Sequence, residues 1–173
     1  MKIVLNKSIK GKILDIGGGG EGVIGRLYGK QVLAVDNRQE ELDEAPGGFE
    51  KMLMDARKLD FSDEFFDAVT AFYSFMFMDN ETREKAALEM ARVLKKGGKI
   101  CIWDTEIPSS EEEPFCVDLE IVLPEENIKT TFGIAGFDIE QNSENIKNFF
   151  EKTGLICKEE KKTENNFYFE FVK

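Results

Sequence analysis

Hydrophobic residues gather in five short runs through the first two thirds of the chain, separated by polar and glycine-rich segments. A short apolar run bounded by turn residues is typical of a buried strand. The intervening segments have the spacing of helices with one apolar face. Because strands and helices alternate, the pattern predicts an α/β fold with a doubly wound parallel sheet. The predicted strands are residues 12–16, 31–35, 51–54, 66–74 and 99–104, and the predicted helices are 22–28, 37–45 and 80–96.

The pattern changes after Ile107. Residues 108–114 are expected to form a solvated acidic loop, and two runs joined by Pro-Glu-Glu predict an inserted β-hairpin over about 115–134. Asn80 and Ser143 are the expected N-caps of two helices, because short polar side chains satisfy free backbone N–H groups there. The remaining expected elements are a lead-in over 1–10 with residues 3–5 packed on the core, hairpin strands 115–123 and 127–134, a helix ending at Lys152, and strands 155–162 and 166–172. Residues 1–173 are expected to form a single domain.

Four consecutive glycines follow the first predicted strand in the sequence ILDIGGGGEGVIG. Glycines at such a turn supply positive φ angles and let a ligand approach the backbone closely. Gly17, Gly19 and Gly22 match the spacing G-x-G-x-x-G. The next predicted strand is followed by Asp36, where a carboxylate that binds ribose hydroxyls is expected. The pattern therefore indicates a cofactor that contains a nucleoside.

Asp15 distinguishes between the possible cofactors. A carboxylate this close to the glycine turn would repel the pyrophosphate of a dinucleotide. It suits S-adenosylmethionine, which presents an ammonium group and has no phosphate. Glu21 adds a second negative charge to the same loop.

The runs LDIGGGGEG, VLAVD, MDARKLDF, FDAVTAFYSFMF and ARVLKKGGKICIWD resemble class I S-adenosylmethionine-dependent methyltransferases over residues 12–106. The resemblance implies a mostly parallel seven-stranded sheet whose final strand is antiparallel, and S-adenosylmethionine as cofactor. It also implies that the glycine turn, Asp36, Asp55, Phe72 and Asp104 surround one crevice. The residues implied to bind the cofactor are Asp15, Gly17, Gly18, Gly19, Asp36, Asn37, Asp55, Ala56 and Phe72, and those expected on the substrate side are Tyr73, Ser74 and Met76.

The loop after the fourth strand does not identify the methyl acceptor. It has neither the Ser-Leu-His-His-like string nor the N/D-P-P-Y/F string found in some members of the family. Phe77 and Met78 are expected in the core, whereas Phe75 is equally compatible with the core and with the substrate pocket. The chain has no histidine, so no general base is assigned. Tyr73 is expected to position the substrate, because its phenol is neutral near pH 7.

Composition narrows the class of partner. The net charge of −11 argues against nucleic acid and anionic membranes. The three cysteines show no metal-ligand pattern, and with no predicted membrane span they favour a cytoplasmic protein with reduced thiols. Two functions remain open. One is a methyltransferase for a small-molecule acceptor. The other is a cofactor-binding module that works with a partner, suggested by the missing N-terminal helices that cover the active site in many relatives.

Overall fold

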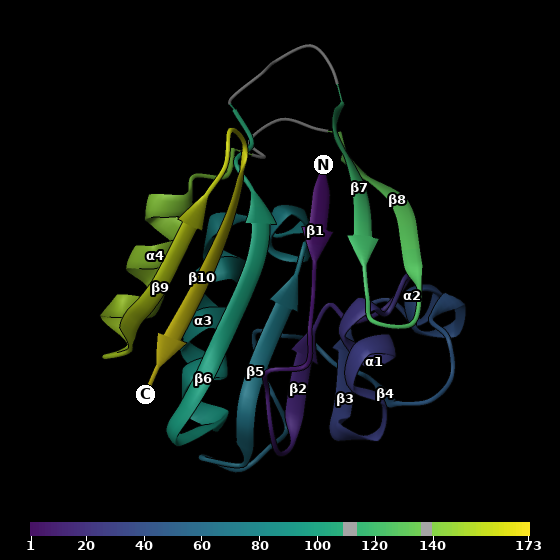
Figure 1. The fold of residues 1–173 in the computed structure, drawn as a ribbon. Helices are drawn as coiled ribbons and strands as arrows, with labels where there is room; N and C mark the ends of the chain where they lie inside the picture. Colours follow the sequence, from purple (N-terminus) through teal and green to yellow (C-terminus); the bar gives the residue numbers. More distant parts are fainter. Residues whose placement is uncertain (109–113, 136–139) are drawn as a thin grey trace.

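The main sheet has seven strands, ordered β4-β3-β2-β5-β6-β10-β9 in a computed structural model that describes residues 1–108, 114–135 and 140–173 (Figure 1). In chain order these strands are β2 (Ile13–Ile16), β3 (Val32–Asp36), β4 (Glu50–Leu53), β5 (Phe66–Phe72), β6 (Leu94–Thr105), β9 (Ile156–Lys162) and β10 (Asn166–Val172). Neighbouring strands from β4 to β6 pair in parallel, and β10 is antiparallel to both of its neighbours. The predicted fold class is confirmed.

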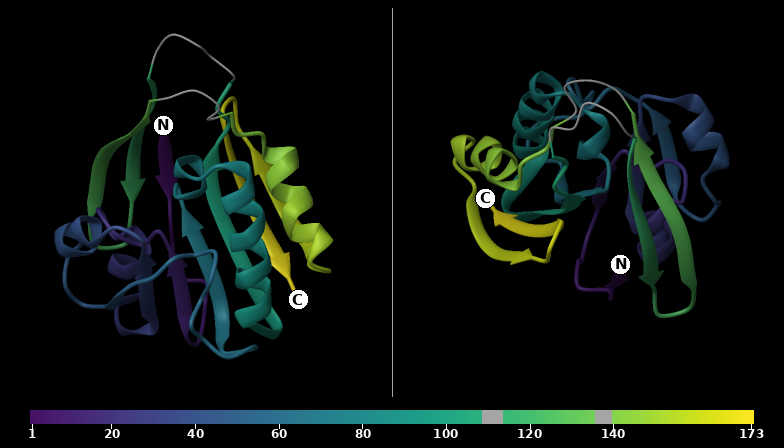
Figure 2. Two further views of the ribbon diagram at one scale, coloured as in Figure 1. Left: turned by 180° about the vertical axis from the view of Figure 1, so that it is seen from behind. Right: turned by 90° about the horizontal axis from the view of Figure 1, so that it is seen from above.

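Helices cover both faces of this sheet (Figure 2). They are α1 (Val23–Tyr28), α2 (Gln39–Glu44), α3 (Asn80–Val93) and α4 (Ser143–Lys152), with the 3₁₀ turns η1 (Gly29–Gln31) and η2 (Phe75–Phe77). Strand side chains alternate between two clusters, as a pleated strand requires. Leu14 and Ile16 join the cluster formed with α3 and α4, whereas Ile13 joins the cluster formed with α1. Burial on both faces explains the nearly continuous apolar runs.

A second, three-stranded sheet stands beside the carboxyl ends of the main strands (Figure 1). Its strands, in the order β1-β7-β8, are β1 (Lys2–Val4), β7 (Phe115–Val122) and β8 (Asn127–Ile134). The hairpin is therefore confirmed, but the sequence did not predict β1, which pairs in parallel with β7 and sets Ile3 opposite Ile121. Ile3 and Leu5 are buried as expected, while Val4 is 59% exposed.

Several predicted helix ends are wrong by one to three residues, including both ends of the helix predicted over 37–45, which is observed as α2. The N-cap of α3 is Asp79, whose carboxylate accepts a hydrogen bond from the Thr82 N–H at 2.7 Å. Asn142 caps α4, and Ser143 is the first helical residue. Helix α3 ends at Val93 because the backbone becomes extended at Leu94 and pairs with β5. The expected acidic loop falls mainly on residues 109–113, which lie outside the described part of the chain.

Candidate functional site

The glycine loop between β2 and α1 places a stretch of backbone without side chains at the carboxyl end of the sheet. Gly17 has a φ of +67°, and its N–H and that of Gly18 donate to the Val35 carbonyl at 2.8 and 3.2 Å. A Cβ on Gly18 would lie 2.6 Å from Asp15 Oδ2 and 2.8 Å from Ala34 Cβ. The loop therefore has no room for a side chain at this position.

Asp15 is buried in β2, directly against this loop. Its side chain is 2% exposed and accepts a hydrogen bond from the Thr70 hydroxyl at 2.7 Å. Burial raises the pKa of Asp15 to about 7, and the nearby Asp36 carboxylate acts in the same direction. A cation at this point would favour the ionised carboxylate. The geometry suits the role that the sequence predicted for Asp15.

Asp36 lies at the end of β3 and faces the same loop. Its two carboxylate oxygens accept hydrogen bonds from the Gly19 N–H at 3.3 Å and the Arg38 N–H at 3.0 Å. The adjacent Asn37 is exposed. Asp36 therefore supports the loop backbone in addition to its expected contact with a ribose.

Asp55 and Ala56 follow β4, the strand next to β3, and both are half-buried. The guanidinium of Arg57 binds the Asp55 carboxylate at 2.6 and 3.0 Å. These hydrogen bonds hold the pKa of Asp55 below its ordinary value. The pair keeps the carboxylate ionised and fixed in position at the end of the strand.

The turn after β5 packs against the glycine loop. A Cβ on Gly17 would lie 2.4 Å from the Ser74 Cβ, and the buried Ser74 hydroxyl has no hydrogen-bond partner among the described residues. Tyr73 has a φ of +50°, and its hydroxyl donates to Asn166 Oδ1 at 2.6 Å. Burial raises the pKa of Tyr73 above its usual range. Phe72 is buried beside the rings of Tyr73 and Trp103.

The next residues separate into core and surface. Phe75 and Met76 are completely buried. Phe77 is 51% exposed, so its predicted place in the core is wrong, and its ring meets Phe132 of β8 edge-on. Met78 is half-buried against the core, as expected. Strand β5 ends at Phe72, two residues before its predicted end, and a 3₁₀ turn over Phe75–Phe77 follows it and leaves Phe77 at the surface.

The hairpin contacts both sides of this region. Phe132 stacks on Tyr73 with 5.6 Å between ring centroids. The Thr130 hydroxyl donates to the Glu21 carboxylate of the glycine loop. Arg26 of α1 forms an ion pair with Glu126 at 2.9 Å, beside the start of β8. The second sheet therefore lies over the carboxyl end of the main sheet, where the hairpin is expected to replace the N-terminal helices that cover the active site in many relatives.

Three buried polar residues near this turn were missed or misplaced by the sequence reasoning. Asp104 was expected at the crevice, but it is completely buried under the turn. Arg83 and Gln141 are also buried, and neither was singled out. Arg83 lies four residues before Ala87 and seven before Met90, on the apolar stripe of α3. A charge on such a stripe is a signal that could have identified it.

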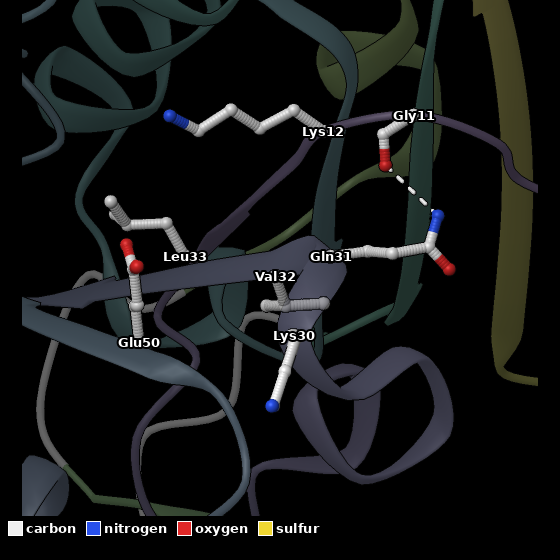
Figure 3. Close-up of a pocket in the computed structure, with 7 residues that line it drawn as sticks. All are labelled: Gly11, Lys12, Lys30, Gln31, Val32, Leu33 and Glu50. Atoms are coloured by element: carbon white, nitrogen blue, oxygen red, sulfur yellow. Dashed lines mark hydrogen bonds between the residues drawn. The ribbon is translucent and has the colours of Figure 1, made fainter.

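A cavity of about 260 Å³ lies at the opposite end of the sheet, beside the amino ends of β2 and β3 (Figure 3). Its walls include Lys12, Lys30 and Glu50. Gln31 reaches across to the Gly11 carbonyl at 3.0 Å. Ligands of open α/β sheets bind at the carboxyl ends of the strands. The cavity therefore does not belong to the predicted site.

The residues around the glycine loop fit S-adenosylmethionine. The loop offers backbone without side chains, and Asp15 offers a carboxylate beside it. The unpartnered Ser74 hydroxyl is a donor and acceptor for a polar ligand. Asp36 and Asp55 end adjacent strands, where a ribose and an adenine can lie next to each other.

Comparison with known proteins identifies the class. Residues 14–102, about half of the chain, match the family model described as a methyltransferase domain. The chain belongs to the class I S-adenosylmethionine-dependent methyltransferase family, whose cofactor is S-adenosylmethionine.

Individual relatives agree with this class. The chain is 36% identical over 103 residues to a phosphatidylethanolamine N-methyltransferase of Cereibacter sphaeroides, covering 53% of this chain and 49% of that protein. It therefore spans about half the length of this relative. Its fold is similar to that of a methyltransferase from Methanosarcina mazei, with a TM-score of 0.63, 19% identity and coverage of 94% and 92%. The glycopeptide N-methyltransferase MtfA in complex with S-adenosyl-L-methionine gives a TM-score of 0.62, 15% identity and coverage of 95% and 87%.

The described residues contain no helix long and apolar enough to cross a membrane. Within the same ranges, no group of three or more His, Cys, Asp or Glu side chains is arranged to hold a metal ion.

Proposed function

We propose that this chain transfers a methyl group from S-adenosylmethionine to an amine-bearing small molecule. The observation that carries the proposal is the contact of bare glycine backbone with Asp15 on one side and the unpartnered Ser74 hydroxyl on the other. A ligand with a cationic, hydrogen-bonding end suits this environment, whereas a pyrophosphate does not.

Each predicted cofactor residue has a distinct part in this proposal. Asp15 pairs with the ammonium group, and the backbone of Gly17, Gly18 and Gly19 permits close approach. Asp36, followed by Asn37, accepts hydrogen bonds from the ribose hydroxyls. A carboxylate has about four lone-pair positions, so Asp36 can do this while it holds the Gly19 and Arg38 N–H groups.

The adenine end depends on the neighbouring strand. The Asp55 carboxylate accepts from the exocyclic amine, and the backbone N–H of Ala56 meets the ring. Arg57 fixes the orientation of Asp55 and leaves acceptor positions free. Phe72 contributes apolar surface beneath the cofactor.

When bound, the cofactor supplies an electrophilic methyl group on a sulfonium. The chain contributes alignment and exclusion of water. Tyr73 and Ser74 on the substrate side, together with the hairpin, orient the acceptor, whereas Met76, also expected there, is buried in the core. Tyr73 keeps its proton, because burial raises its pKa, so it positions and does not act as a base.

An amine acceptor suits a site without an assigned base. A neutral amine attacks with its lone pair, a C–N bond forms as the C–S bond breaks, and the extra proton is lost to solvent afterwards. Two further facts support an amine. The relative from Cereibacter sphaeroides is named as an N-methyltransferase. The net charge of −11 attracts the protonated, cationic form of an amine, which is in equilibrium with the neutral form that reacts.

The alternative, a cofactor-binding module without catalysis, is not favoured. Its main support was the absence of an N-terminal cover. The sheet of β1, β7 and β8 provides a cover by another route.

Two measurements test the proposal. Calorimetric titration should detect saturable binding of S-adenosylmethionine and S-adenosylhomocysteine and none of NAD. Incubation with S-adenosylmethionine and a panel of small amines, thiols and alcohols should then release S-adenosylhomocysteine with amines only. Binding of NAD in place of S-adenosylmethionine would overturn the cofactor assignment, and turnover with alcohols alone would overturn the acceptor assignment.

A further inference from the structure

Two buried charged side chains hold the turn that follows β5 from opposite sides. Asp104, at the end of β6, accepts hydrogen bonds through Oδ2 from the N–H groups of Phe75 at 3.0 Å and Met76 at 3.3 Å. Arg83 of α3 donates through Nε to the Phe75 carbonyl at 3.1 Å. The negative charge therefore binds the donors of the turn, and the positive charge binds its acceptor.

The same two side chains also bind the segment through which the chain returns from the hairpin. Arg83 Nη1 donates to the Glu140 carbonyl at 2.8 Å. Asp104 Oδ1 accepts from Gln141 Nε2 at 2.7 Å. Ile107 and Gln141 exchange backbone hydrogen bonds at 2.9 and 3.0 Å, which brings the outgoing and returning segments together.

The energetics make these contacts depend on one another. A buried charge is tolerated only while its hydrogen bonds are made. Asp104 and Arg83 are 0% and 2% exposed, so a movement of the turn away from either side chain would leave a buried charge without its hydrogen bonds. The same is true of the return segment. Moreover, within the described part of the chain Arg83 Nη2 and Gln141 Oε1 lack hydrogen-bond partners, so the loss of a further hydrogen bond would add to an existing cost.

We propose that Asp104 and Arg83 are positioning residues that couple the acceptor-side turn at Phe75 and Met76 to the return segment at Glu140 and Gln141, so that the two segments open together. This inference rests on the proposed function for its consequence, namely that the turn is held in the position needed to orient an acceptor. Its structural content does not depend on turnover.

Hydrogen exchange tests the coupling directly, because it reports local opening. Asp104→Asn preserves size and removes the negative charge, whereas Arg83→Gln removes the positive charge and shortens the side chain. Each variant should speed amide exchange at Phe75, Met76 and Gln141 together, by at least about fivefold, because buried partners lose a charged hydrogen bond. Exchange in β2 should not change.

Lys85→Gln is the matched control for Arg83→Gln. Lys85 lies on the same helix, is exposed, and pairs only with Glu81 at 2.6 Å. It should leave exchange at both segments as in the wild type. Faster exchange in the turn while Gln141 stays protected, in both variants, would overturn the coupling.

A second readout uses Trp103, the one tryptophan of the chain, which precedes Asp104 and packs on Tyr168 with 4.9 Å between ring centroids. Burial raises the pKa of Asp104 to about 6. The charged and titratable side chains that influence it are Arg83 and Tyr73. Trp103 emission should therefore change with a midpoint near pH 6 in the wild type, and exchange at both segments should increase together below that pH.

In Asp104→Asn the transition in emission should disappear, and its persistence would contradict the assignment. If this variant does not fold, the wild-type pH series and Arg83→Gln decide the question. With an acceptor identified, both variants should lower kcat at least about fivefold and leave cofactor affinity within about twofold. Equal losses of kcat and cofactor affinity would show a general structural role instead. Failure to find any acceptor would count against the proposed function and leave the exchange and emission results intact.

Discussion

Replacing Gly18 by alanine tests whether the glycine loop is built for close approach. The added Cβ would lie 2.6 Å from Asp15 Oδ2 and 2.8 Å from Ala34 Cβ. Ala34 is fixed in the parallel ladder with β2, and Asp15 is held by Thr70 at 2.7 Å. Overpacking of this kind costs about 1–3 kcal/mol. In a chain of this length, each kcal/mol lowers the melting temperature by about 2–4 °C.

The same displacement should weaken cofactor binding. We expect a loss of at least about tenfold in affinity, because moving Asp15 by a few tenths of an ångström affects a charge-assisted hydrogen bond worth about 1.5–3 kcal/mol. Melting curves followed by calorimetric titration of S-adenosylmethionine measure both effects on the same sample.

Gly47→Ala is the matched control for this experiment. A Cβ on Gly47 meets nothing within 4 Å, and its φ is not in the left-handed region. Alanine there should be neutral or stabilise by up to about 1 kcal/mol, with unchanged cofactor affinity. If Gly18→Ala behaves like Gly47→Ala in both measurements, the reasoning from close packing at Gly18 is refuted.

Three further predictions concern the same site. Asp36→Ala should weaken cofactor binding at least about tenfold, more than Asp36→Asn, and should also lower the melting temperature slightly because Gly19 loses an acceptor; wild-type affinity would mean that the ribose binds elsewhere. Burial raises the pKa of Asp15 from 3.8, its ordinary value in an unfolded chain, to about 7 in the folded protein. Between these pH values the folded state binds more protons than the unfolded state, so the free energy of unfolding should fall as pH rises from about 4 to 7. Cofactor affinity should rise over the approach to pH 7 as the carboxylate ionises, and Asp15→Asn should remove both effects. Deleting residues 115–134 should spare cofactor affinity and abolish turnover, and loss of cofactor binding would instead assign the hairpin a supporting role.

The central strands of the main sheet were predictable because they are buried on both faces. Leu14, Ile16 and Val69 are all inaccessible, and such runs differ plainly from the polar turns around them. The glycine loop was predictable for a different reason. Gly17 has a positive φ angle and Gly18 has no room for a Cβ, so the glycines in the sequence mark the loop directly.

Features set by distant contacts were not predictable. Strand β1 is three residues long and forms only because β7 offers it an edge. Asp79 takes the cap of α3 from Asn80 through a hydrogen bond to Thr82, and both residues have good cap side chains. Asp104 is buried because it accepts hydrogen bonds from the Phe75 and Met76 N–H groups, a contact that no local pattern reveals. The acceptor side of the site is formed mainly by contacts between residues that are far apart in the sequence.

The pairing of β1 with β7 has a consequence for the order in which the protein forms during synthesis. Residues 2–4 are synthesised before their partners at residues 120–122, which appear only after β6 has been made. Pairings so far apart in sequence form slowly, because the intervening chain must be ordered first. The glycine loop and the parallel strands around it can therefore assemble while Ile3 is still without a neighbour. The cover over the site is the part of the nascent chain that is completed late.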